Sequence, residues 1–87
     1  MTLSIIIPVF NEQATIKKVL RQVSEVPLTI DKEIIVIDDG SLDKTPQILE
    51  NLKKELNFKL LSHGKNQGKG AAIRTGLAQA TGDFVIV

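Results

Sequence analysis

The stretch Ile34-Ile35-Val36-Ile37-Asp38-Asp39-Gly40-Ser41 decides the fold class, because an unbroken apolar run leads directly into two adjacent carboxylates. Apolar β-branched residues without polar alternation are typical of a strand that is covered on both faces. Such strands belong to parallel sheets more often than to hairpins. We therefore predict a buried strand over residues 33–37, followed by a polar loop.

Three further runs rich in Ile, Val, Leu or Phe predict strands at residues 3–7, 58–61 and 83–87. The last of them is also apolar without alternation, which predicts a strand covered on both faces. Helical spacing fills the first two gaps, with the apolar residues Ile16, Val19, Leu20 and Val23 in one and Ile48, Leu49, Leu52 and Leu56 in the other.

The helix boundaries are predicted from capping residues. Asn11 is a candidate N-cap for the first helix, and Thr45 followed by Pro46 predicts the N-cap and first residue of the second. The third helix, residues 70–80, is built of small residues that allow close packing on a sheet. The alternation predicts an α/β fold, a Rossmann-like open parallel sheet with helices on both faces and right-handed crossovers.

The chain is predicted to be one domain portion, residues 1–87, that is truncated in its fourth strand. An apolar edge strand recruits other chains, so we expect self-association through residues 83–87. The formal net charge of +1 is too small for a general nucleic-acid binder, and the absence of cysteine excludes thiol chemistry. No apolar run approaches the roughly 20 residues of a membrane span, which favours a cytoplasmic location.

Residues that follow parallel strands are the candidate site, since ligands bind at that edge of an open α/β sheet. Pro8 ends the first predicted strand, and Asn11 and Glu12 follow it. Helix capping explains Asn11 and Glu12 as well as ligand binding does. Asp38 and Asp39 form an Asx-turn in one interpretation; in the other they accept hydrogen bonds from a ribose or a nucleobase.

The third predicted strand leads into the loop SHGKNQGKG, residues 62–70. Its glycines and the cations Lys65, Lys69 and Arg74 favour a phosphate site, and a flexible solvated loop is the alternative. His63 is interpreted as structural because no acidic partner can be assigned to it. The loop lacks the Walker A spacing, and residues 39–50 lack the glycine of a calcium loop, so an ATPase and an EF-hand are both rejected.

Three segments, IIIPVFNE (5–12), IIVIDDGSLDKT (34–45) and NQGKGAAIRTG (66–76), together resemble the inverting family 2 glycosyltransferases. The chain is most similar to the branch of polyprenyl-phosphate or dolichyl-phosphate mannose and glucose synthases. The resemblance implies the N-terminal portion of a GT-A domain. It also implies that the whole protein acts at the cytoplasmic face of a membrane.

The resemblance also assigns roles to individual residues. It implies that Pro8, Phe10 and Glu12 line the nucleotide, that Ile37 and Asp39 contact base or ribose, that Asp38 shapes the same turn, and that Lys69 and Arg74 bind the nucleotide as well. No catalytic residue falls within the chain. An Asp-x-Asp motif that holds Mg²⁺ or Mn²⁺ is expected after Val87.

The resulting hypothesis is the nucleotide-binding part of an enzyme that transfers a sugar from a nucleoside-diphosphate sugar to an acceptor such as a polyprenyl phosphate. The 87 residues alone are expected to be inactive. The alternative is a non-catalytic receiver-like or nucleotide-binding signalling module, since paired aspartates also suit Mg²⁺-dependent phosphorylation. The third strand of the sequence ends in Ser62-His63-Gly64 and lacks the phosphorylated aspartate that a receiver needs.

Overall fold

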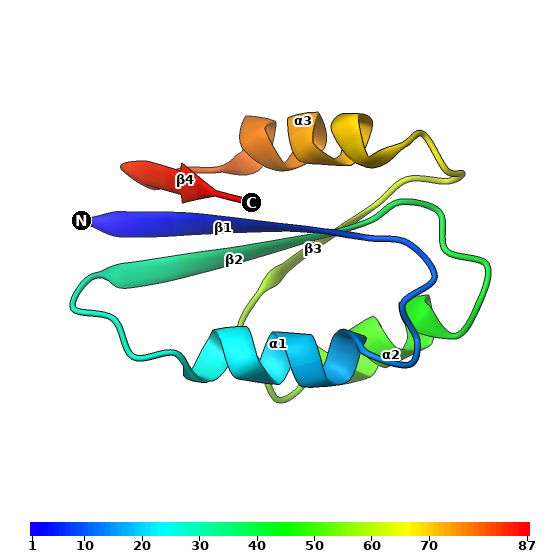
Figure 1. The fold of residues 1–87 in the computed structure, drawn as a ribbon, viewed down its shortest axis with the longest axis horizontal. Coiled ribbons are helices and arrows are strands. Elements are labelled where there is room, and N and C mark those ends of the chain that lie inside the picture. Colours follow the sequence, from blue (N-terminus) through cyan, green and yellow to red (C-terminus); the bar gives the residue numbers. More distant parts are fainter.

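The computed structural model describes residues 1–87 as an open sheet of four parallel strands with helices on both faces (Figure 1). In chain order the elements are β1 (Thr2–Val9), α1 (Ile16–Glu25), β2 (Asp31–Asp38), α2 (Thr45–Leu52), β3 (Lys59–Ser62), α3 (Lys69–Gln79) and β4 (Phe84–Ile86). The strand order is β3-β2-β1-β4. Helices α1 and α2 cover one face and α3 covers the other, which confirms the predicted α/β architecture.

Strand β2 contributes to the hydrophobic core on both faces of the sheet, because its successive side chains point to opposite faces. Ile34 and Val36 join the cluster beneath α1 and α2, whereas Ile35 and Ile37 join the cluster beneath α3. All four are buried, and burying one such side chain stabilises a fold by about 1.5 to 3 kcal/mol. The unbroken apolar run is therefore explained by two covered faces.

Helix α3 approaches the sheet closely because it has small residues on its inner side. A Cβ atom at Gly76 would lie 2.6 Å from Ile6 Cγ2 and 2.8 Å from Ile37 Cδ1. Ala72, one turn earlier, is completely buried. The small-residue pattern thus correctly predicted a tightly packed helix.

The first strand continues further than predicted. Pro8 lies inside β1, paired in register with Ile37, and does not end the ladder. The carbonyls of Met1 and Val9 accept hydrogen bonds from the β2 side of the strand, whereas the carbonyl of Thr2 accepts one from the β4 side. Alternation along the strand directs the nitrogen of Pro8 toward the β4 side, where pairing extends only from Leu3 to Ile5. The missing N–H therefore costs no ladder hydrogen bond.

Two predicted helix boundaries were wrong. Asn11 is not the N-cap of α1, which begins at Ile16; it has a φ of 51° and is bonded to the loop after β2. Thr45 is the first residue of α2 rather than its cap, and Asp43 accepts the hydrogen bond from its amide. Leu56 lies beyond the end of α2 but still packs against the core.

Strand β4 pairs with β1 on one side only and is exposed. Phe84 and Ile86 are 52% and 51% exposed, so the prediction of a strand covered on both faces does not hold in this chain. The apolar edge that led us to expect self-association is present. Self-association itself stays a prediction.

Glu33 joins three strands and the turn before β4. Its carboxylate accepts hydrogen bonds from Ser4 Oγ and from the amide and hydroxyl of Thr81, and it pairs with Lys59 Nζ at 2.9 Å. The Thr81 amide contributes most to lowering the pKa of Glu33 from 4.5 to about 2, followed by Lys59 and Ser4. Because the folded-state pKa is lowered, this stabilisation is complete above about pH 4.5 and is lost as the pH falls toward 2.

We expect Glu33→Gln to lower the free energy of unfolding by about 1 to 3 kcal/mol at pH 7 and to flatten the loss of stability in acid. Urea unfolding followed by circular dichroism is the measurement, because the chain has no Trp or Tyr. Glu25→Gln, on an exposed residue at the end of α1, is the matched control and should change neither quantity. An acid profile of Glu33→Gln as steep as that of the wild type would contradict this role.

Candidate functional site

The carboxyl ends of β1, β2 and β3 meet at one edge of the sheet. Val9 is paired with Asp38, and Asp38 with Ser62. The next residue of each strand therefore follows in the same row. Phe10, Asp39 and His63 are thus brought together from three separate parts of the chain.

The loops after β1 and β2 are bonded to each other along their length. Asn11 donates its amide to Ser41 Oγ at 2.9 Å and accepts from the Leu42 amide at 2.8 Å. The Glu12 amide donates to Thr45 Oγ1 at 2.9 Å. Two further bonds join the side chain and amide of Gln13 to Lys44 and Asp43. These contacts hold the two loops together as one wall of the site. They also give Asn11 and Asp43 a structural role.

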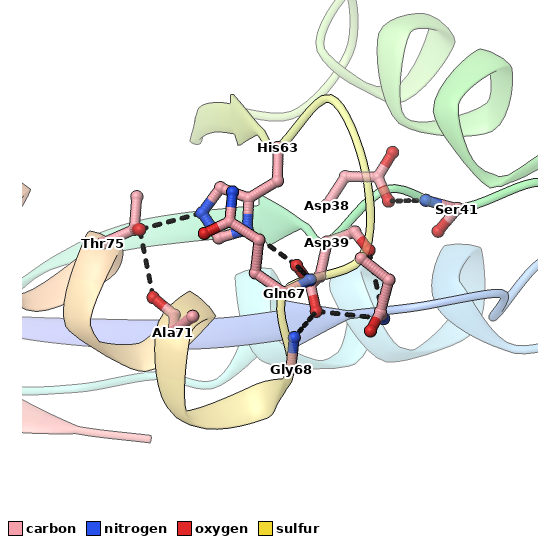
Figure 2. A network of polar contacts seen from close by, with 9 residues as sticks. Asp38, Asp39, Ser41, His63, Gln67, Gly68, Ala71 and Thr75 are labelled. Atoms are coloured by element: carbon pink, nitrogen blue, oxygen red, sulfur yellow. Dashed lines mark hydrogen bonds and ion pairs between the residues drawn. The ribbon is translucent and has the colours of Figure 1, made fainter.

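Asp39 holds the loop after β3 (Figure 2). Its Oδ1 lies 2.7 Å from His63 Nδ1 and accepts the Gln67 amide at 2.9 Å. Its Oδ2 accepts the Gly68 amide at 2.8 Å and Asn66 Nδ2 at 3.1 Å. A carboxylate offers about four acceptor positions, so these donors use its capacity. The Asp39 side chain is 3% exposed.

The structure gives His63 an acidic partner, Asp39, which could not be assigned from the sequence. Its other ring nitrogen, Nε2, lies 2.9 Å from Thr75 Oγ1 on α3, and Figure 2 shows the ring between Thr75 and Asp39. The signal for this pair lies in the strand register, which the sequence alone does not give. Asp39 and His63 each stand one residue beyond the paired residues Asp38 and Ser62.

Hydrogen bonding keeps the carboxylates of this edge ionised. The bond from His63 contributes most to lowering the pKa of Asp39, the amides of Gln67 and Gly68 lower it further, and burial opposes them. For Asp43 the largest single influence is burial, which raises its pKa. The hydrogen bonds from Thr45 and Gln13 together outweigh burial, so the pKa of Asp43 is lowered. Both groups therefore act as hydrogen-bond acceptors.

A cleft of about 310 Å³ opens at this edge. It is lined by Pro8, Val9, Phe10, Glu12, Asp39, Asn66, Lys69 and Ala72. Five of the eight residues singled out from the sequence are among them. Asn66 was missed because an amide in a glycine-rich loop carries no distinctive sequence signal.

The structure places the other three candidates outside the cleft lining. Ile37 is completely buried in the cluster beneath α3, so its side chain does not reach the cleft surface. Asp38 accepts the Ser41 amide at 3.1 Å, which fits the predicted role in shaping the turn. Arg74 is exposed on α3 and does not line the cleft.

The cleft has one wall that is suited to an anion. Lys69 is in its lining, and neither Lys69 nor Lys65 or Arg74 takes part in an ion pair. The first amides of α3 have no preceding carbonyl to bond, and they face outward from the N-terminus of a helix of 11 residues. Phe10, 40% exposed, gives the same cleft an aromatic side chain.

The chain contains no cluster of three or more His, Cys, Asp or Glu side chains that could hold a metal ion. The carboxylate oxygens of Asp39 and Asp43 are engaged with protein donors instead. Within these 87 residues, the donor set does not fit a metal site. No helix has the length and apolar character needed to cross a membrane.

An open parallel sheet with a polar cleft beyond the carboxyl ends of its strands is the arrangement in which α/β domains bind ligands. Residues 4–87 match the sequence family described as Glycosyl transferase family 2. The chain belongs to this family, and this membership displaces the receiver-like alternative.

Two curated relatives match nearly the whole chain. It is 40% identical to an undecaprenyl-phosphate 4-deoxy-4-formamido-L-arabinose transferase of Pseudomonas fluorescens, over 95% of this chain and 26% of that protein. It is 34% identical to a dolichyl-phosphate beta-glucosyltransferase of Trichomonas vaginalis, over 98% of this chain and 29% of that protein. Both belong to the branch that the sequence motifs resemble, and the chain spans about a quarter of their length.

Solved structures confirm the fold as the N-terminal part of a GT-A domain. Residues 1–349 of S. aureus TarS, in complex with UDP-GlcNAc, match with a TM-score of 0.84 and 35% identity, over 99% of this chain and 25% of that one. A mannosyltransferase from Pyrobaculum calidifontis, solved with GDP-Man and Mn²⁺, matches with a TM-score of 0.79 and 27% identity, over 95% of this chain and 25% of that one.

Proposed function

We propose that this chain is the nucleotide-binding part of a glycosyltransferase that transfers a sugar from a nucleoside-diphosphate sugar. The observation that carries the proposal is the cleft of about 310 Å³, where Phe10, Glu12 and Lys69 converge from the ends of separate elements. The relatives solved with UDP-GlcNAc and with GDP-Man support it. In this proposal Phe10 stacks on the base, and Lys69 with the first amides of α3 attracts the diphosphate.

The site residues keep the roles implied by the resemblance, except that the structure suggests changes for Asp39, Ile37 and Arg74. Asp39 is proposed to face the base or ribose while its carboxylate holds the loop after β3. A hydrogen-bond donor group of the nucleotide would have to share the Asp39 carboxylate with its present protein donors or displace one of them. The bond from the Asn66 side chain, at 3.1 Å, is the longest of the four. Ile37 contributes through packing, and Arg74 through charge at a distance.

The acceptor in this proposal is a polyprenyl phosphate, supported by the names of the two curated relatives. The whole protein would then act at the cytoplasmic face of a membrane. For the whole domain we propose Mg²⁺ or Mn²⁺, held by an Asp-x-Asp motif beyond Val87, in line with the Mn²⁺ in the mannosyltransferase structure. The cation would offset charge on the leaving diphosphate.

We expect the 87-residue chain to bind UDP or GDP weakly and equally well with Mn²⁺ or with EDTA. Lys69→Gln should weaken binding about three- to tenfold, because it removes a cation from the cleft. Isothermal titration at fixed ionic strength measures this, and Lys53→Gln, an exposed lysine after α2, is the control with the same charge change. Equal weakening by the two substitutions would show that the diphosphate does not lie at Lys69.

A further inference from the structure

His63 is a largely enclosed polar side chain to which the proposed binding assigns no role. It does not line the cleft, its side chain is only 10% exposed, and both ring nitrogens have partners within the chain. The ring joins the end of β2, through Asp39, to the second turn of α3, through Thr75 (Figure 2).

The hydrogen on Nδ1 is assigned by its partner. The pKa of Asp39 is lowered, so its carboxylate is ionised and can only accept a hydrogen bond. The 2.7 Å contact is therefore a bond that Nδ1 donates to Oδ1. Thr75 is itself fixed, because its hydroxyl bonds to the Ala71 carbonyl at 3.1 Å.

The loop of residues 64–68 is attached differently from the other two loops of the site. The loops after β1 and β2 are joined by five side-chain hydrogen bonds. In contrast, the hydrogen bonds from Asn66, Gln67 and Gly68 to the rest of the protein all end on Asp39. Three of these four bonds end on the Asp39 carboxylate, and its position therefore constrains the position of the loop.

We propose that His63 is a positioning residue for the nucleotide cleft: it fixes the Asp39 carboxylate against α3, and through Asp39 it fixes the loop of residues 64–68. That loop carries Asn66 into the cleft and leads to Lys69. This inference rests on the proposed function for its effect on nucleotide binding. Its effect on the loop can be measured without a nucleotide.

Two substitutions test whether the position of the loop depends on the hydrogen bond that Nδ1 donates or only on the volume of the side chain. His63→Leu retains apolar bulk and removes both hydrogen bonds. His63→Asn places an amide nitrogen near the position of Nδ1, so it keeps a donor for Asp39 while giving up the bond to Thr75. Glu33→Gln is the control, because it should destabilise the fold at the opposite end of β2 without touching this loop.

Without nucleotide, we expect the amide proton resonances of Gln67 and Gly68 to shift strongly in His63→Leu and to remain near wild-type positions in His63→Asn and Glu33→Gln. With UDP, His63→Leu should bind about tenfold more weakly, and His63→Asn within about threefold of the wild type. Both variants are compared at a temperature where circular dichroism shows them folded.

Unchanged Gln67 and Gly68 resonances in a folded His63→Leu variant would overturn the positioning role. Equal loss of UDP affinity in His63→Leu, His63→Asn and Glu33→Gln would also overturn it, since that result reports only general destabilisation. If the wild type binds neither UDP nor GDP, the proposed function fails, whereas the nucleotide-free amide resonances still decide the role of His63.

Discussion

Replacing Gly40 with alanine is expected to remove measurable nucleotide binding and to destabilise the fold by about 2 to 4 kcal/mol. Gly40 has a φ of 73°, a conformation that L side chains rarely adopt. A Cβ there would lie 2.4 Å from the carbonyl carbon of Lys65 and 2.5 Å from the amide nitrogen of Asn66. Both are backbone atoms, so the whole glycine-rich loop would have to move away from β2.

The matched control is Gly64→Ala in that same loop. Gly64 has no positive φ, and a Cβ there meets nothing within 4 Å. We expect its stability to change by less than about 0.5 kcal/mol. Urea unfolding by circular dichroism and UDP titration measure both variants, and a Gly40→Ala protein as stable as Gly64→Ala would show that the two segments do not pack as described.

Asp39→Asn should produce the second large effect, even though it changes only one oxygen to an amide nitrogen. The carboxylate accepts four hydrogen bonds, from His63, Asn66, Gln67 and Gly68. The amide nitrogen of the substituted side chain would face N–H groups that now donate to a carboxylate oxygen. It cannot accept hydrogen bonds from them, so some of these N–H groups would be left unpaired. We expect the melting temperature to fall by roughly 10 °C and UDP affinity to fall at least about tenfold.

Asp31→Asn makes the same charge change at an exposed residue at the start of β2 and should leave both quantities unaltered. Acid should weaken the contribution of Asp39 as well. Its pKa is lowered in the folded state, so the contribution is complete above its ordinary pKa of 3.8 and is lost as the pH falls through the folded-state value. A melting temperature in Asp39→Asn equal to that in Asp31→Asn would contradict the role of Asp39 in holding the loop.

The fold was predictable because strand burial leaves a strong sequence pattern. The apolar run of residues 34–37 marks a strand with two covered faces, and its four side chains do enter two separate clusters. Pro8 was misjudged because local rules treat proline as ending a strand. Tertiary pairing decides instead, since β4 pairs only with Leu3 to Ile5 and leaves the nitrogen of Pro8 without an expected partner.

The site was predictable in its location and less so in its connections. Strand ends and a glycine-rich loop are visible in the sequence, and Phe10, Glu12 and Lys69 do line one cleft. Hydrogen bonds between residues far apart in the chain are not visible without the strand register. For this reason Asn11 was assigned to a helix cap rather than to the loop after β2, and His63 was left without its carboxylate.

Ile37 illustrates a further limit. The resemblance attaches a nucleotide contact to its position, but a motif does not say whether a side chain or the backbone makes that contact. In this chain the Ile37 side chain is completely buried beneath α3. Substitutions at Ile37 therefore report on core packing before they report on binding.

The most direct test of the central claim, that a nucleoside diphosphate binds at the carboxyl edge of this sheet, is a titration of the ¹⁵N-labelled chain with UDP and with GDP. We predict that at least one nucleotide shifts the amide resonances of Phe10, Glu12 and residues 66–72, while those of residues 81–86 at the opposite edge stay unchanged. Absence of any shift at millimolar nucleotide, or shifts confined to residues 81–86, would contradict the claim.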